Sequence, residues 1–237
     1  MSVWHALKSC FGGRKQRLFI GQFAIFFIFS MLLGVSLQIT NSFANPYITH
    51  FENIPIYQNT FGVQHANILI SLSQVSETLC ILLIPFFLRR YGIKKVMLIA
   101  MFAWVLRFGF FGLGNPGAGV WLFVLSCIVY GVAFDFFNIS GSLFVDKETD
   151  QGIRSSAQGL FFLMTNGIGA TIGTLSAQAI VNHFVYNQAA AGATPEMLAK
   201  GWQSAWFIFA LYALVVAVVF AIVFKYKHNP EELKDKR

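Results

Sequence analysis

The chain has 237 residues, of which 56% are hydrophobic and only 11% are charged, with a formal net charge of +7 and a mean hydropathy of +0.62. A soluble domain carries about 25% charged residues, and a fold of this size cannot keep 27 phenylalanines and the other apolar side chains from water. The composition therefore excludes an ordinary soluble domain and predicts an integral membrane protein.

Six apolar runs are long enough to cross a bilayer as helices, because a hydrocarbon core of about 30 Å takes roughly 20 apolar residues. None alternates apolar with polar residues as barrel strands do. The first run is longer than the apolar stretch of a signal peptide, about 7–15 residues, and no clear cleavage site closes it. The predicted spans are 20–45, 63–88, 95–114, 120–145, 157–186 and 203–224.

The connections between these runs are short, as in a compact bundle. The outer connection at about 46–62 has room for a small surface helix, and the next is a tight turn at 114–117. The third runs from Asn187 to Trp202, where Thr194 is placed to cap a short helix at Pro195. The inner connections are 89–95 and 146–154.

Lysine and arginine are distributed very unevenly over this topology. Fifteen of the 17 fall on the side of the termini, Lys200 falls on the other side, and Arg107 lies within a span. This pattern explains the net charge better than binding of nucleic acid does, and the positive-inside rule then places both termini in the cytoplasm. We expect a cytoplasmic segment at 1–19, a six-helix bundle at 20–227 and a cytoplasmic tail at 228–237.

Three ionisable residues lie well inside the predicted spans: Glu77, Arg107 and Asp135. Such side chains are costly in lipid and usually face the interior of a bundle or an aqueous cavity. A purely structural alternative is that Arg107 pairs with one of the acids to hold helices together. The two acids are the stronger indication of function.

Polar and aromatic side chains repeat on one face of three spans, at separations of three or four residues. A cavity lined in this way can stack a planar ring on its aromatics and hydrogen-bond the ring's edge or hydroxyl groups. Hydrogen bonding between helices is the alternative interpretation. The residues are Gln38 and Asn41 in the first span, Gln74 and Glu77 in the second, and Tyr130, Phe134 and Asn138, beside Asp135, in the fourth.

Other patterns indicate no chemistry. The spacing Gly169-x-x-x-Gly173 is typical of close helix packing. The three cysteines are far apart, and no metal-ligand spacing, nucleophile motif or phosphate loop occurs. Glu77 and Asp135 have no nucleophile or metal to work with, so we expect neither an enzyme, nor a cofactor, nor a metal site.

Several stretches resemble a known family. The loop RRYGIKK (89–95) is similar to the short basic-glycine loop of the major facilitator superfamily. More specific are AIFFIFSMLLGVSLQITNSFAN (24–45), SQVSETLCILLIPFFLRRYGIKKVM (73–97), IVYGVAFDFFNISGSLFV (128–145) and IRSSAQGLFFLMTNGIG (153–169). Together they resemble the second half of the bacterial nucleoside:proton symporters, over nearly all of residues 20–227.

The resemblance implies half of a major facilitator fold in the bacterial inner membrane, with nucleosides and protons as cargo. It implies a missing N-terminal half, or a second copy of the chain, as partner, so the chain alone is not expected to transport. The implied substrate-binding residues are Gln38, Asn41, Gln74, Glu77, Tyr130 and Phe134, with Asp135 as the proton carrier and Glu77 as the alternative carrier. Two other functions stay open: transport of another small polar solute such as a sugar, and a non-transporting membrane partner subunit.

Overall fold

The computed structural model describes residues 14–226, and the side chains from residue 21 onward; over this range the chain is helical and contains no strand. Five helices are long and apolar enough to cross a membrane. One of these, α4 (Ala66–Leu113), is two helices joined at a sharp turn, so the described residues form six spans. The predicted fold class, an all-α six-helix membrane bundle, is thereby confirmed.

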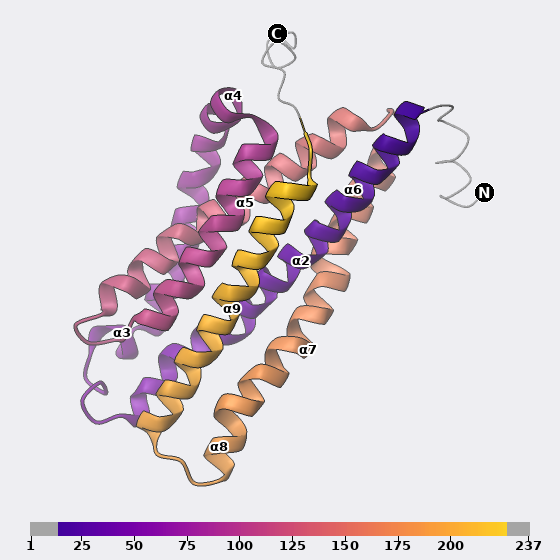
Figure 1. The fold of residues 1–237 in the computed structure, drawn as a ribbon. Coiled ribbons are helices and arrows are strands. Elements are labelled where there is room, and N and C mark those ends of the chain that lie inside the picture. Colours follow the sequence, from indigo (N-terminus) through magenta and orange to yellow (C-terminus); the bar gives the residue numbers. More distant parts are fainter. Residues whose placement is uncertain (1–13, 227–237) are drawn as a thin grey trace.

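The break in α4 lies at Gly92, whose φ of 76° and ψ of 167° are not helical. A straight helix of 48 residues would be about 72 Å long, more than twice the thickness of a hydrocarbon core. Figure 1 shows that α4 turns back on itself instead, so that its two halves run in opposite directions. We call them α4a (residues 66–91) and α4b (residues 93–113).

The first predicted span is part of α2 (Arg14–His50), and the outer connection after it holds the short helices η1 (Phe51–Asn53) and α3 (Phe61–Gln64). The fourth span is α5 (Val120–Glu148). The fifth is the continuous run of α6 (Arg154–Phe162), η2 (Leu163–Gly169), α7 (Ala170–Val181), η3 (Asn182–Tyr186) and α8 (Asn187–Ala190), in which η2 and η3 are π-helical. The sixth is α9 (Pro195–Val223).

Most helices are longer than the apolar runs predicted from the sequence, because they also include the polar residues at their ends. The start of α9 corrects one expectation. Thr194 does cap a helix, accepting a hydrogen bond from the backbone N–H of Met197 at 3.4 Å, but this helix is the long α9 and not a separate short one. The predicted segments 1–19 and 228–237 lie mostly outside the described residues, although α2 already begins at Arg14.

The start of α2, the turn within α4, the α5–α6 connection and the end of α9 lie at one end of the bundle (Figure 1). The α8–α9 connection lies at the other end. The basic segments 89–95 and 147–154 belong to the first end, and Lys200, in the first turns of α9, belongs to the second. The structure therefore segregates the described cations as the sequence predicted, while their orientation across the membrane stays a prediction.

Close packing between α2 and the fifth span depends on glycines. A Cβ added at Gly34 would lie 2.0 Å from the backbone oxygen of Thr165, and one added at Gly169 would lie 2.4 Å from that of Met31. A Cβ at Gly173 would approach the backbone of Val35 at 2.9 Å. The interpretation of Gly169 and Gly173 as packing residues is thus confirmed, and the backbones come this close only because these residues have no side chain.

The turn at Gly92 is open to a direct test. Its φ and ψ are reached almost only by glycine, so we expect Gly92→Ala to lower the free energy of unfolding by about 1–3 kcal/mol. Thermal unfolding of the detergent-solubilised chain measures the effect. The matched control is Gly109→Ala in the helical part of α4b, where an added Cβ meets no atom within 4 Å. Equal effects of the two substitutions would contradict the assigned role of Gly92.

Candidate functional site

The candidate site is built where α4a crosses α5. A Cβ added at Gly131 would lie 2.6 Å from the carbonyl carbon, the carbonyl oxygen and the Oγ of Ser76, so this glycine permits the close crossing. The Ser76 hydroxyl also donates a hydrogen bond to the backbone carbonyl of Ile128 on α5. Glu77 follows Ser76 directly, and Tyr130 precedes Gly131. The crossing therefore brings the predicted residues of two spans together.

Both predicted acids belong to this crossing. The half-buried Glu77 lies close enough to Tyr130 and Asp135 to interact electrostatically with both. Asp135 is only 6% exposed, and its Oδ2 has no hydrogen-bond partner. The sulfur of Cys80, one helical turn after Glu77, is also close enough to Asp135 to interact with its charge. Two carboxyl groups thus share one low-dielectric site.

The predicted aromatic pair, Tyr130 and Phe134, lies on α5 next to the acids. The rings of Tyr130 and Phe134 are stacked, with centroids 5.8 Å apart and planes within 2° of each other. Trp104 on α4b meets the Tyr130 ring edge-on at 5.8 Å. Phe134 is half-buried, so part of its ring is accessible for stacking. Contacts on three sides hold Tyr130 in one orientation: Trp104, Phe134 and the guanidinium described next.

Arg107 on α4b is 2% exposed, and its guanidinium is in contact with neutral groups of the protein. Its Nη1 donates to the backbone carbonyl of Ser126 at 2.7 Å, and its Nε donates to the Oγ1 of Thr40 at 3.3 Å. Its Cζ lies 4.3 Å from the centroid of the Tyr130 ring. No carboxylate of the described residues makes an ion pair with it, so the pairing considered from the sequence is not a direct one.

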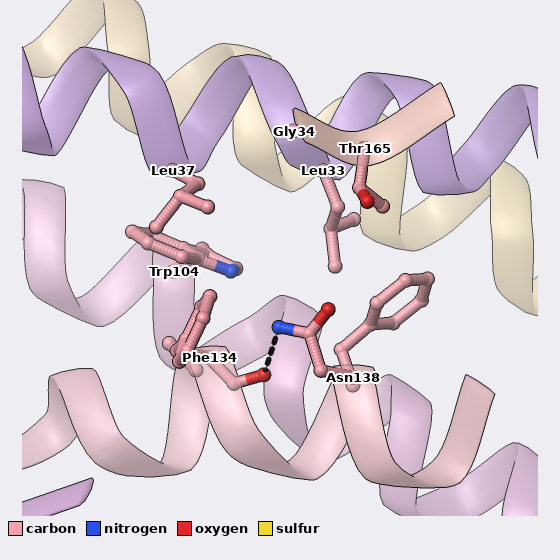
Figure 2. Close-up of a pocket in the computed structure, with 9 residues that line it drawn as sticks. Leu33, Gly34, Leu37, Trp104, Phe134, Asn138 and Thr165 are labelled. Atoms are coloured by element: carbon pink, nitrogen blue, oxygen red, sulfur yellow. Dashed lines mark hydrogen bonds between the residues drawn. The ribbon is translucent and has the colours of Figure 1, made fainter. Parts of the chain in front are cut away.

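A small cavity of about 10 Å³ lies beside this cluster, between α2, α4, α5 and η2 (Figure 2). It has room for about one water molecule, whereas a site for a whole small molecule takes about 300–1,000 Å³. Asn138 faces it and donates from Nδ2 to the backbone carbonyl of Phe134 at 2.9 Å. The lining residues are Leu33, Gly34, Leu37, Trp104, Ala133, Phe134, Phe137, Asn138 and Thr165.

The other predicted residues lie on neighbouring parts of the same helices. Gln74 is exposed one turn before Glu77 on α4a, and Asn41 is exposed on α2. Gln38 is half-buried and donates to the Oγ of Ser42, one turn further along α2. No hydrogen bond of the described residues joins these three amides to the acids. Thr40, the residue before Asn41, reaches the cluster through Arg107.

The structure adds residues that the predicted site omitted. Trp104 and Arg107 contribute from the third span, which the sequence interpretation left without a site residue. A tryptophan is not unusual in an apolar run, so nothing in the sequence marked Trp104 as a site residue. Arg107 did give one, as an ionisable residue in mid-span, but its neutral partners could not be foreseen. Asn138 continues the four-residue repeat from Tyr130 and Phe134, and that repeat was the signal for it.

A bundle of membrane-spanning helices with an acid and an arginine buried at mid-span, and a second acid half-buried beside them, belongs to the class of polytopic membrane transporters. The chain is a member of the nucleoside H+ symporter family, whose sequence profile matches residues 5–229. The family is one of transporters and not of enzymes. These findings support a multi-pass protein of the bacterial inner membrane.

Several relatives match over most of the chain. It is 54% identical over 206 residues to the nucleoside permease NupG and 50% identical over 214 residues to the xanthosine permease, both of Escherichia coli K12. These alignments cover 86% and 90% of this chain but 47% and 49% of the two permeases. The putative nucleoside transporter YegT of the same organism is 31% identical. The chain thus spans about half the length of the curated relatives it matches.

Solved structures agree with this assignment. The crystal structure of the nucleoside transporter NupG matches 87% of this chain with a TM-score of 0.77 and 52% identity, and that of a mutant of NupG matches with a TM-score of 0.78 and 51% identity. The chain covers 49% and 48% of these structures. Half of a major facilitator fold, the predicted architecture, is therefore confirmed. That it is the C-terminal half remains an expectation from the resemblance.

The crossing of α4a and α5 generates a prediction. Gly131→Ala places a methyl group against the backbone of Ser76, so we expect α4a and α5 to separate and the free energy of unfolding to fall by about 1–3 kcal/mol. Gly159→Ala in α6 is the control, because a Cβ there meets open space and alanine favours a helix. Thermal unfolding in detergent compares the two, and unchanged stability of Gly131→Ala would refute the close crossing.

Proposed function

We propose that this chain is one half of a nucleoside transporter driven by proton symport. The observation that carries the proposal is the pair of carboxyl groups, Glu77 and Asp135, held in mid-span beside a stacked aromatic pair. Such a combination suits a cargo with a planar ring and hydroxyl groups. Membership of the nucleoside H+ symporter family and the names of the relatives support the same cargo.

For cargo recognition we propose Gln38, Asn41, Gln74, Glu77, Tyr130 and Phe134. The exposure of two of the amides supports their use by a ligand. Asn41 and Gln74 are exposed within apolar spans, where contact with lipid is unfavourable for an amide. A face that carries them is suited to an aqueous cavity or to a second bundle. There the amides hydrogen-bond the cargo, while the half-buried Phe134 stacks against its base and the Tyr130 ring supports Phe134.

For proton coupling we propose Asp135. Its Oδ2 is buried and lacks a hydrogen-bond partner, and the group interacts electrostatically with another acid, Glu77. A carboxylate in these surroundings is poorly solvated, and binding a proton removes the unfavourable charge. Reversible protonation of this group during the transport cycle then couples the proton gradient to the movement of cargo. The neighbouring Glu77 is the alternative carrier.

The transport unit requires a second bundle, because transporters of this fold place cargo between two halves that rock against each other. We propose that this chain acts with a bundle that supplies the other wall of the cavity, either the half that its relatives possess and this chain does not match, or a second copy of the chain. Uptake of radiolabelled uridine into vesicles distinguishes the two. Activity of the chain by itself identifies the second copy, and activity only with the other half of NupG identifies the first.

The division of roles can be tested in the assembled transporter. We expect Asp135→Asn to abolish accumulation driven by a proton gradient while changing the dissociation constant of uridine by less than about tenfold, because asparagine cannot release a proton. Gln74→Ala and Asn41→Ala should instead weaken binding about 2- to 12-fold, the effect of losing a hydrogen bond worth roughly 0.5–1.5 kcal/mol, and leave coupling intact. Calorimetric titration and uptake with and without a pH gradient separate the two effects. Accumulation by Asp135→Asn would assign the proton to Glu77.

The proposed orientation places both termini in the cytoplasm, on the basis of the Lys/Arg asymmetry. Reporter fusions after residue 237 and between Ala191 and Thr194, in the α8–α9 connection, should report opposite sides of the membrane, with the first reporter cytoplasmic. Two reporters on the same side would contradict the six-span topology. Two reporters on opposite sides, with the terminus outside, would contradict the orientation alone.

A further inference from the structure

We propose that the small cavity beside Phe134 is a hydroxyl site: it holds one oxygen atom, which accepts a hydrogen bond from the indole N–H of Trp104 and donates one to the amide oxygen of Asn138. In the free chain the oxygen belongs to a water molecule, and in the loaded transporter to this water or to a hydroxyl group of the cargo. The role toward cargo rests on the proposed function, whereas the site itself is a property of this chain alone.

Trp104 supplies an unused donor. Its side chain is 2% exposed, and its indole nitrogen points into the cavity and makes no hydrogen bond to any residue of the described range (Figure 2). The indole nitrogens of Trp202 and Trp206 are also buried without a partner, but neither of these residues lines the cavity. An N–H group left inside a protein without an acceptor is costly. Trp104, unlike the other two, opens onto a space that an acceptor can fill.

Asn138 supplies the matching acceptor. Its Nδ2 donates to the backbone carbonyl of Phe134 at 2.9 Å, which fixes the orientation of the amide. The amide oxygen therefore points away from this carbonyl and into the cavity, where no residue of the described part of the chain donates to it (Figure 2). Thr165, a third residue of the wall, already uses its hydroxyl hydrogen on the backbone carbonyl of Phe161 at 3.0 Å, so toward the cavity it only accepts.

The size and the polarity of the cavity match one hydroxyl oxygen. Its volume of about 10 Å³ gives room for about one water molecule, and a buried water takes about two to four polar partners. A carbonyl group has no hydrogen to donate to Asn138, and an amide or ammonium nitrogen does not accept from Trp104. Water and alcohols do both. The donor and the acceptor in the wall thus select the chemical class of the ligand.

The position of the cavity connects it to the proposed cargo. Phe134, on which the base is proposed to stack, forms part of its wall, and the ring of Phe134 is only half-buried. A water held by Trp104 and Asn138 keeps one hydrogen and one lone pair for a further partner, and a bridging water is almost as favourable as a direct hydrogen bond. The cavity therefore serves as a subsite for a hydroxyl group of the cargo, which reaches it directly or through the water.

The competing explanation is a dry gap between the side chains of Leu33, Leu37 and Phe137, which also line the cavity. Apolar voids of this kind hold no water. The two explanations differ in what lies next to the indole N–H of Trp104. In a dry gap no water proton is near it, and the amide of Asn138 has no influence on its surroundings.

The first experiment detects the water in the 237-residue chain in detergent, with isotope-labelled tryptophan. We expect a nuclear Overhauser cross-peak between the Trp104 N–H and water, its loss in Asn138→Leu, and no such cross-peak for Trp206. The chain has five tryptophans, and Trp104→Phe assigns the signal. If that variant does not fold, replacement of the others in turn assigns it by elimination. A missing cross-peak at Trp104, or one that is kept in Asn138→Leu, would overturn the proposal.

The second experiment identifies the source of the oxygen in the transporter assembled with the other half of NupG. The cross-peak is recorded with saturating uridine and with its 2′-, 3′- and 5′-deoxy analogues. A cross-peak that is kept with uridine identifies the water. One that is lost with uridine but kept with a single analogue identifies the hydroxyl group that this analogue lacks. Loss with uridine and with all three analogues would overturn the assignment as a hydroxyl site.

Calorimetric titration of uridine tests the subsite itself. We expect Trp104→Phe and Asn138→Leu each to weaken binding about 2- to 12-fold, the effect of losing one hydrogen bond. The double variant should bind like the weaker of the two, because both residues hold the same oxygen. Losses that multiply, or no loss, would overturn the subsite.

The matched control is Trp206→Phe, which removes an indole N–H that does not line the cavity and should leave uridine binding unchanged. If the assembled wild type binds no uridine while the free chain shows the water, the nucleoside proposal fails and the water site stands.

Discussion

The hydrocarbon core of a bilayer contains no water to solvate a charge, so in this fold the groups around Arg107 take the place of water. The guanidinium cannot become neutral as a carboxyl group can, so its donors and its charge need partners within the protein. The partners are a backbone carbonyl, a hydroxyl and two aromatic faces, drawn from α5, α2 and α4. Satisfying one side chain thereby fixes the relative positions of three spans.

Glycine makes these contacts possible, because without an aqueous phase helices associate through close packing and not through burial of apolar surface. Gly131 lets α4a approach α5 until the Ser76 hydroxyl reaches a carbonyl of the other helix. Gly34 and Gly169 bring α2 and η2 to backbone contact in the same way. The π-helical turn of η2 lies at this contact, with Thr165 facing both Gly34 and the small cavity. Small residues thus determine where the polar groups meet.

The six spans could be predicted because hydrophobicity over about 20 residues is a local property of the sequence. The turn at Gly92 was foreseen in position, as a break between two apolar runs, but its conformation was not. Of the site, Glu77, Tyr130, Phe134 and Asp135 were predicted and do lie together. Their proximity follows from helix packing, which periodicity within one helix cannot reveal. Trp104 was missed for the same reason, since its role depends on the ring it meets on another helix.

The cluster of Glu77, Arg107, Tyr130 and Asp135 also explains how one half of such a fold can hold much of the proposed transport site while that site stays open on one side. Asp135, Tyr130 and Arg107 are buried within the chain and depend on no other bundle for their contacts. Asn41 and Gln74 are exposed, and an exposed amide in mid-span is stable only against water, cargo or another polar surface. The groups proposed to hold charge are therefore organised within this half, whereas two of the amides proposed to bind cargo, Asn41 and Gln74, face outward from it.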